Sequence, residues 1–529
     1  MHFNGEVTNL DSTTLLAADR ALAVSLASVR ERLNGLCAIN RLPPELLAMI
    51  FYHVPMTYQH VSPWESNVQA CSNLLPITYV CKHWRAVVLG APYLWSHVTP
   101  IFPAQISLSR SRNLPLRVYI TYDSHRVLEE ILQSRRPILE LCCEGDHIYG
   151  RMPSDYSASH LESFTLANYN SPGETLRNIT LFDGKVPRLQ ELALATSNWP
   201  LPSHPLPALR RLSVDACNNI QISALVRVFS SSPYLEHLVV RGSDLMIDHL
   251  TTKPIHMDRL ETIYIKTIST QAATGILSSV SVNPGTAVYL SGIDTLVIPR
   301  SHCKPDACRV AIWQTAEKII LAATGSSTAI WSTCKPGDTI AAHGAAFDAM
   351  QKLPLEKVTE LWMEDLLPIS ALAQHLNALL RALTNVATLY IHIPHASYII
   401  QHLMDDESNP PLCPRLATLY MHSDLEGDDS EIDIDFICEL AERRKRIGHP
   451  IPKVVIDMLD QTELTDPDFQ EDIDRLKKSV GKVDLARGGK IAMDMPVCCD
   501  TCPHHWWRPW SRRWWDIRNG DTYDDIAGW

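Results

Sequence analysis

A repeated pattern of leucines limits the folds open to this chain of 529 residues. Between about residues 100 and 460 the form Pro-x-Leu-x-x-Leu-x-Leu recurs, mostly every 20–30 residues, which is the spacing of leucine-rich repeats. Each copy predicts a short strand with alternate side chains buried, entered through a turn that proline sets. The copies that can be read lie around Leu161, Leu189, Leu209, Leu235, Leu260, Val358, Val386 and Leu416.

Segments between these strands have helical periodicity, for example ISALVRVF at residues 222–229 and LAQHLNALLRAL at 372–383. One strand with its return segment cannot bury its apolar face alone, whereas stacked units share a continuous core. We therefore predict an α/β solenoid with parallel strands over residues 100–460. The alternative is an ordinary α/β domain whose strands happen to follow proline. Residues 269–348 match least well, although IDTLVIPRS and AEKIILAATG are readable as degenerate strands.

Before the repeats, residues 42–95 predict three short helical pieces, each opened by proline. The first has an apolar stripe formed by Leu46, Leu47, Ile50, Phe51 and Val54. In the second, which begins near Pro76, one face carries Ile77, Val80, Cys81, Trp84 and Val88. The third is a turn, Pro92-Tyr93-Leu94-Trp95. A unit this short has little interior, so we expect one face to be buried against a partner.

These residues resemble the F-box. Its pattern of Leu-Pro-x-Glu-Leu/Ile-Leu-x-x-Ile-Phe, then Val-Cys-Lys-x-Trp-Arg, then Pro-x-Leu-Trp, stands here in order from Leu42 to Trp95. The departure is a long insertion at residues 56–73. Together with the repeats, this resembles the F-box proteins with a leucine-rich-repeat-like region that are expanded in mushroom-forming (basidiomycete) fungi. The expected layout is a helix at 11–37, the F-box at 40–98, the repeats at 100–460 and a charged, then Trp/Cys-rich tail at 461–529.

The resemblance implies that the F-box binds the Skp adaptor of a cullin–RING (SCF-type) ubiquitin ligase, while the repeats bind a protein substrate. The matched positions would supply the adaptor-facing surface and part of the box's own core. We expect Leu46, Ile50 and Trp84 to be mostly core, and Leu42, Pro43 and Leu47 to be mostly interface. The full set of matched positions is Leu42, Pro43, Leu46, Leu47, Ile50, Phe51, Val80, Trp84, Leu94 and Trp95.

Residues 11–37 predict an amphipathic helix with Asp11 or Ser12 as its N-cap. Leucine and valine recur there in steps of four and three, the spacing of a coiled-coil seam, at Leu22, Leu26, Val29, Leu33 and Leu36. The pattern covers fewer than about four heptads. Packing against the F-box and self-association both remain open.

Composition narrows the class of protein further. The net charge of −12 disfavours a general nucleic-acid binder. Fourteen irregularly spaced cysteines fit reduced thiols, and neither a secretory signal nor a run of about 18 apolar residues is visible. We therefore expect a soluble, cytoplasmic or nuclear protein. The basic run at residues 443–446 suits either a solvated helix end or a nuclear-localisation signal.

Two features near the C-terminus carry weak metal signals. The acidic residues at 405–435 lack the order of a calcium loop, so we expect a solvated segment. Cys499, Cys502, His504 and His505 are candidate zinc ligands, but no distant second pair is evident, and a free-thiol tail is the alternative. We expect the tail's tryptophans to dock on the body of the protein or to bind a partner. No cofactor is expected.

No nucleophile elbow, Walker loop, dinucleotide fingerprint or His-Glu-x-x-His motif is present, and His392, His395 and His422 have no evident acid partner. Together with the F-box resemblance, which implies a substrate receptor, this predicts a non-catalytic protein. The alternative is a repeat scaffold in a ligase-independent complex. An enzyme with a non-local site is a third hypothesis, and it predicts a deep pocket that collects His, Asp and Cys.

Overall fold

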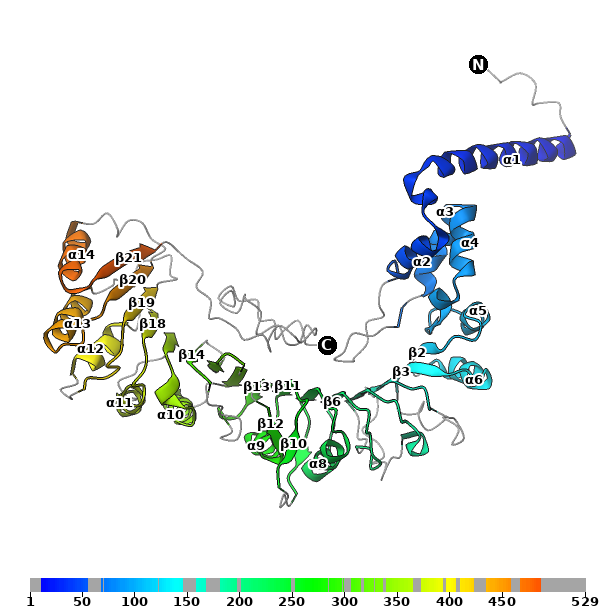
Figure 1. The fold of residues 1–529 in the computed structure, drawn as a ribbon. Coiled ribbons are helices and arrows are strands. Elements are labelled where there is room, and N and C mark those ends of the chain that lie inside the picture. Colours follow the sequence, from blue (N-terminus) through cyan, green and yellow to red (C-terminus); the bar gives the residue numbers. More distant parts are fainter. Residues whose placement is uncertain are drawn as a thin grey trace. The chain divides into compact units, whose positions relative to one another are not determined.

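The computed structural model divides the chain into two compact units, Met1–Asn170 and Ser171–Trp529. The structure describes residues 11–55, 68–69, 71–121, 123–145, 158–167, 181–196, 201–248, 253–283, 285–296, 298, 306–314, 318–327, 329–335, 339–364, 373–392, 396–405, 410–422, 434–457 and 467–486. Figure 1 shows helices opening the first unit and a run of strands with helices along the second.

The first unit begins with helices and ends with a small sheet. Its helical elements are α1 (Ser12–Leu36), η2 (Ala38–Arg41), α2 (Pro44–Tyr52), η3 (Cys71–Leu74), α3 (Leu75–Val80), α4 (Lys82–Gly90), η4 (Pro92–Trp95), α5 (Ala104–Arg110) and α6 (His125–Gln133). Its strands are β1 (His97–Val98), β2 (Leu116–Thr121), β3 (Ile138–Glu144) and β4 (Ser163–Ala167). These four strands pair in sequence order, and every pair is parallel.

The second unit alternates strands with helices or irregular segments. Its main strands are β5 (Glu191–Ala195), β6 (Arg211–Asp215), β8 (His237–Arg241), β11 (Thr262–Lys266), β13 (Ala287–Ile293), β14 (Arg309–Gln314), β15 (Ile319–Thr324), β16 (Ala329–Cys334), β17 (Glu360–Glu364), β18 (Thr388–His392), β19 (Thr418–His422), β20 (Lys453–Asp457) and β21 (Lys482–Ala486). Short strands β7 (Ile220–Gln221) with β9 (Leu245–Met246), and β10 (Ile255–Met257) with β12 (Val280–Val282), form two small parallel pairs.

Helices lie along one face of the second unit's sheet (Figure 1). They are α8 (Ile222–Ser231), α9 (Thr270–Ser279), α10 (Thr339–Met350), α11 (Ala373–Ala382), α12 (Ala396–Asp405), α13 (Ile434–Arg446) and α14 (Pro467–Ser479). The unit also contains two short segments, η5 (Leu181–Gly184) and η6 (Leu355–Lys357). The prediction of an α/β, solenoid-like fold after an N-terminal helical unit is confirmed. In the part of the chain that the structure describes, no helix is long and apolar enough to cross a membrane.

The predicted parallel order holds at both ends of the second unit and fails in its middle. From β5 through β6, β8 and β11 to β13 each strand is parallel to the next, and so is each from β17 to β21. Between these two runs β16 pairs with β13, and β14 pairs with β17, which reverses the order of β14, β15 and β16. Strand β15, in the segment AEKIILAATG, is antiparallel to both of its neighbours. The meander arises because only short connections join these three strands.

The leucine or valine that opens a repeat closes the turn before its strand in seven of the eight copies named above. The backbone N–H of Leu189 donates to the carbonyl of Val186, and that of Leu209 donates to Leu206. The same bond to the residue three positions earlier recurs at Leu161, Leu235, Leu260, Val358 and Leu416. All of these opening residues are buried. The leucine therefore fills the core and sets where the strand starts, which explains why the turn and the strand recur together.

A second recurring feature lies at the other end of the strands. The residue after β5, β6, β8 and β11 has positive φ, and its N–H donates to a carbonyl of the next strand. The acceptor is the last residue of that strand in the first three cases, and Ser291 within β13 in the fourth. Glycine fits this left-handed conformation at Gly242 (φ 54°), but Thr196, Ala216 and Thr267 adopt it without glycine. The sheet hydrogen bond at this residue offsets the local cost, which is about 1 kcal/mol for a residue that has a Cβ.

Arg444 departs from the solvated helix end expected for residues 443–446. It is 1% exposed, and its guanidinium donates to the carbonyls of Leu412 and Cys413 (3.2 Å to Cys413). Its helix packs against α12, so one side of the basic run faces the core while Arg446 is exposed. At Arg444 the expectation of a solvated side chain was wrong.

Candidate functional site

The helices of the first unit enclose a core built around two tryptophans. Trp95 is fully buried, and its indole N–H donates to the carbonyl of Val88 at 2.8 Å. Arg110 lies over its ring at 4.3 Å, and the ring of Trp84 contacts that of Phe51 at 5.0 Å. Other buried members of this core are Leu47, Ala48, Cys71, Leu74, Ile77, Val87, Val88, Ala91, Leu94 and Phe102.

Helix α2 divides the apolar stripe read from the sequence into two faces. Leu47 and Phe51 point to one side and are buried. At 100° per residue, Leu46 and Ile50 lie about 100° around the helix from them, and they are 46% and 42% exposed. Met49 (60%) extends the exposed face along the helix, and Val54 (46%) extends it just beyond the helix end. The helix therefore has a second apolar surface besides the one that holds the core.

The expected separation of core from interface was wrong for three of these residues. Leu46 and Ile50, expected in the core, are exposed, and Leu47, expected at the interface, is fully buried. Leu46 and Leu47 are both leucine, so the sequence does not show which of them faces inward. The apolar stripe of α2 is wider than the part of the helix that the rest of the unit covers.

The second helical piece is two helices, because Cys81 has an extended backbone (φ −158°, ψ 168°) between α3 and α4. The Sγ atom of Cys81 caps α4 by accepting from the N–H of Trp84 at 3.4 Å. The break places Val80 at the end of α3, where it is 54% exposed beside Tyr79 (75%). The shared face expected for Ile77, Val80, Cys81, Trp84 and Val88 is therefore not formed.

Trp84 is half-buried and held by one asparagine. Its indole N–H donates to Asn40 Oδ1 at 2.6 Å, and Asn40 Nδ2 donates to the carbonyl of Asn34 at 2.6 Å. Asn40 thereby joins the C-terminal turn of α1 to the core of the helical unit. Asn40 belongs to no motif, so the sequence gives no sign of this role.

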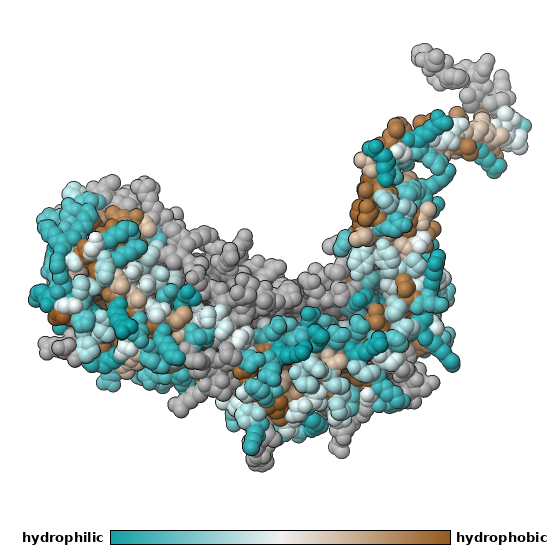
Figure 2. Space-filling view, in the orientation of Figure 1, coloured by the Kyte–Doolittle hydropathy of each residue, from teal (hydrophilic) through white to brown (hydrophobic). Residues whose placement is uncertain are grey.

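The ten positions that match the F-box pattern thus fall into three groups. Pro43, Leu46, Ile50 and Val80 are exposed, and Leu42 and Trp84 are half-buried against the core. The remaining four, Leu47, Phe51, Leu94 and Trp95, are buried in it. The exposed residues, together with Met49, Val54 and Tyr79, form what we call the α2–α3 apolar surface; Figure 2 shows hydrophobic residues on these helices.

The end of the insertion is tied to the first strand. The N–H of Gln69 donates to His97 Nδ1 at 3.1 Å, and the thiol of Cys71 donates to the carbonyl of His97 at 3.1 Å. Burial, followed by the charge of Arg117, lowers the pKa of His97 to about 4. The imidazole is therefore neutral near pH 7 and accepts through Nδ1. Residues 56–67 and 70 of the insertion lie outside the described residues.

The second unit's sheet carries a row of aromatic side chains. Tyr264 alternates with Ile263 and Ile265, so it points to the opposite face from these two fully buried residues. In register beside it, Tyr289 stacks on Tyr264 at 4.8 Å and lies 6.1 Å from Trp331. These three rings are nearly buried.

After the antiparallel meander the aromatic row resumes. Trp362 stacks on Tyr390 at 3.5 Å, and Tyr420 follows at 5.2 Å. The hydroxyl of Tyr420 donates to Asp457 Oδ2 at 2.9 Å, and burial and this carboxylate raise the pKa of Tyr420. Tyr390 and Tyr420 are half-buried, so this end of the row is open to contact.

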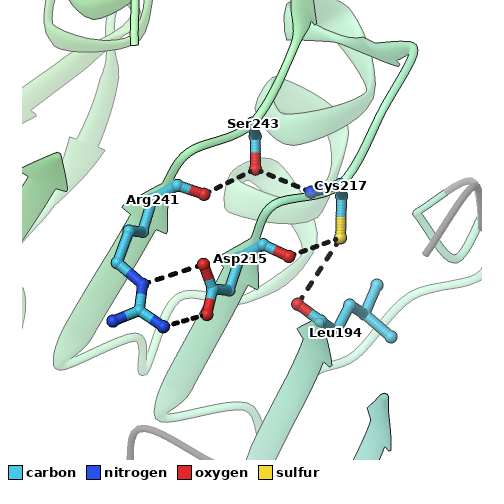
Figure 3. A network of polar contacts seen from close by, with 5 residues as sticks. All are labelled: Leu194, Asp215, Cys217, Arg241 and Ser243. Carbon is cyan, nitrogen blue, oxygen red and sulfur yellow. Dashed lines mark hydrogen bonds and ion pairs between the residues drawn. The ribbon is translucent and has the colours of Figure 1, made fainter. Parts of the chain in front are cut away.

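Ion pairs connect neighbouring strands beside the aromatic row. Figure 3 shows Arg241 donating to both carboxylate oxygens of Asp215, with a distance of 2.8 Å from Nε to Oδ1. Next to them Ser243 Oγ accepts from the N–H of Cys217 at 3.1 Å and donates to the carbonyl of Arg241. Pairs of the same kind join Arg211 to Glu191 (2.9 Å) and Arg309 to Glu360 (3.2 Å). These pairs fix side chains on a face that is both charged and aromatic.

The other candidates from the sequence are not brought together as a site. Strands β18 and β19 pair His392 with His422, but these side chains and His395 lie outside the described residues, as do Cys499, Cys502, His504, His505 and the acidic residues 423–433. Among the described residues no three of His, Cys, Asp and Glu are placed to hold a metal ion. A cavity of about 390 Å³ in the second unit is lined by Glu236, Asp258, Arg259, Leu260, Glu261, Asn283 and Gly285, without histidine or cysteine.

The described residues thus form a small helical unit with an exposed apolar surface, followed by an α/β array of stacked strands. In a comparison with known protein families, the family model described as F-box-like matches residues 39–100, which include α2, α3 and α4 of the helical unit. The chain thus contains an F-box-like domain. No curated protein matches the sequence.

Proposed function

We propose that this chain is a substrate receptor of a cullin–RING ubiquitin ligase of the SCF type. The F-box-like domain would bind the Skp adaptor, and the stacked-strand sheet, which we propose is leucine-rich-repeat-like, would bind a protein substrate. Catalysis would then occur by proximity, with the chain holding the substrate near the ubiquitin-loaded enzyme and contributing no chemical group.

The α2–α3 apolar surface is the observation that carries the proposal. Within it Leu46, Met49 and Ile50 stay exposed on a helix whose other face already supplies the core. Contiguous exposed apolar residues of this kind mark interaction sites. The adaptor would cover Pro43, Leu46, Ile50 and Val80, and the six other matched positions would support that surface from beneath or beside it.

For the substrate, the open end of the aromatic row is the surface that we favour. Tyr390 and Tyr420 present large, rigid and partly exposed rings, which are the side chains that contribute most to protein interfaces. The ion pairs along the neighbouring strands hold charged groups that would favour one partner over another.

A binding measurement with purified Skp adaptor tests the adaptor half of the proposal. Leu46→Asp with Ile50→Asp places two charges on the exposed face of α2, and we expect the affinity to fall by more than about a hundredfold, or 2.8 kcal/mol. Leu485→Asp is the matched control, because Leu485 is 40% exposed on β21 in the second unit. Wild-type protein that does not bind the adaptor, or a double variant that binds as well as the control, would refute it.

The receptor role is tested separately from adaptor binding. Proteins that co-purify with the chain while the proteasome is blocked should become longer-lived in cells that carry the double variant. If adaptor binding is confirmed and these lifetimes do not change, the chain acts as a scaffold in a ligase-independent complex.

A further inference from the structure

Helix α1 is long, apolar on one side and uncovered. It spans 25 residues, and none of its side chains is buried in the described structure. Leu22, Leu26, Val29, Leu33 and Leu36 are each at least 50% exposed, and Figure 2 shows hydrophobic residues along the helix. Helices in water obtain most of their stability from packing an apolar face, and α1 does not pack its apolar face against any other described part of the chain.

We propose that α1 is a dimerisation helix that pairs with α1 of a second copy of this chain in an antiparallel coiled coil. This inference does not depend on the ligase role. It rests on three observations: the heptad register of the exposed residues, the direction in which they face, and the placement of the charged residues around them.

The exposed residues fit one heptad register over the whole helix. With Leu22 at d, the d positions are Leu15, Leu22, Val29 and Leu36. The a positions include Leu26 and Leu33 and are interrupted only by Asp19 and by Ser12 at the helix start. The four d residues are 37–77% exposed, so the seam is apolar at every d position and from Leu22 to Leu36 at every a position.

This seam faces away from the helices of the F-box-like domain. Glu31 occupies an f position, opposite the seam, and its carboxylate lies 3.0 Å from Lys82 Nζ on α4. At the end of the helix, Asn40 holds the carbonyl of Asn34 (2.6 Å). Contacts with the rest of the unit thus use the polar side of α1, and the apolar side remains available to a partner.

Charge placement favours a second copy in the antiparallel direction. In a parallel, in-register pair the two Asp19 carboxylates would face each other at an a position, which destabilises a dimer. In the antiparallel register that sets Leu22 against Leu26 of the second copy, Asp19 lies against Val29 and beside Arg30 of that copy. Both helices use the same surface. In this register Leu15 packs against Leu33 of the second copy and Leu22 packs against Leu26. Val29 lies against Asp19, whose charge is offset by Arg30.

The test uses the full-length chain and its sedimentation or light-scattering mass over about a hundredfold range of concentration, because dimer formation follows mass action. We expect the wild type to convert from monomer to dimer. Leu26→Lys should raise the dissociation constant at least about tenfold, or 1.4 kcal/mol. Val24→Lys is the matched control, because Val24 is 67% exposed at an f position and should leave the constant unchanged.

A charge exchange tests the direction of the pair. Arg30→Glu should weaken the dimer, since the new carboxylate would lie beside Asp19 of the second copy, and Asp19→Lys added to it should restore the wild-type affinity. A monomer at every concentration, or equal weakening by Leu26→Lys and Val24→Lys, would overturn the proposal. No effect of Arg30→Glu on a confirmed dimer would overturn the antiparallel arrangement. The substituted side chains are all exposed, so the variants should keep the wild-type far-ultraviolet circular dichroism. These side chains are Asp19, Val24, Leu26 and Arg30.

Discussion

Acidification should destabilise the first unit through one buried histidine. His97 in β1 is 2% exposed, and its Nδ1 accepts the hydrogen bond from the N–H of Gln69 at 3.1 Å. Protonation would turn this acceptor into a donor that faces another donor. It would also bring a positive charge into a buried site near Arg117, the residue whose charge already disfavours the protonated form.

The size and sign of the effect follow from the pKa of His97, which burial lowers from 6.5 to about 4 in the folded state. Between these two values the unfolded chain binds the proton and the folded chain does not, so the free energy of unfolding falls as the pH falls. The full stability is present above about pH 6.5, and roughly 3 kcal/mol is lost by pH 4, at about 1.36 kcal/mol per pH unit.

Hydrogen exchange resolved by peptide, in mild urea and between about pH 7 and pH 4.5, would measure this loss in β1 and β2 once the intrinsic pH dependence of exchange is removed. A local measurement is needed because burial also lowers the pKa of His237 to about 4 in the second unit. His97→Asn keeps an acceptor near Nδ1 and should abolish the pH dependence in β1 and β2 alone. Stability that is flat with pH in the wild type, or an unchanged slope in the variant, would contradict the reasoning.

Three further predictions concern stability, each measured by urea unfolding of the full chain. Leu47→Ala should cost about 2–5 kcal/mol because the side chain is fully buried, whereas Leu46→Ala should cost under about 0.5 kcal/mol; equal costs would contradict the division of α2. Arg444→Met should lower the stability of the second unit by about 3 kcal/mol, since two buried carbonyls lose their donor, and Arg446→Met should have almost no effect. Ala216→Gly should raise stability by about 0.5–1 kcal/mol, because φ is 47° there; a loss of stability would show that the alanine is not strained.

The sequence by itself determined the kinds of element and their order. The leucine pattern predicted strands such as β5 and β6, and apolar periodicity predicted helices such as α8 and α11. The F-box resemblance agrees with the family match at residues 39–100. These features are local, because the sequence pattern of a turn, a strand or a helix can be recognised within about ten residues.

Tertiary structure alone decided which apolar side chains are covered. Leu46 and Leu47 are adjacent leucines on one helix, and only the packing of α4 and η4 against α2 determines that Leu47 is the buried one. Val80 and Trp84 were separated by the extended backbone at Cys81, which helical periodicity does not reveal. The candidate adaptor surface therefore required the three-dimensional arrangement of helices, although its residues came from the sequence motif.

Local sequence patterns also did not predict which strands pair with each other. The segment of β15 is as apolar as its neighbours, and its antiparallel direction depends on where β14 and β16 find partners, at β17 and β13. The left-handed residues Thr196, Ala216 and Thr267 have no glycine signal, because a hydrogen bond to the next strand holds them. Sequence thus set what each segment can form, and long-range hydrogen bonds and burial set which partners it meets.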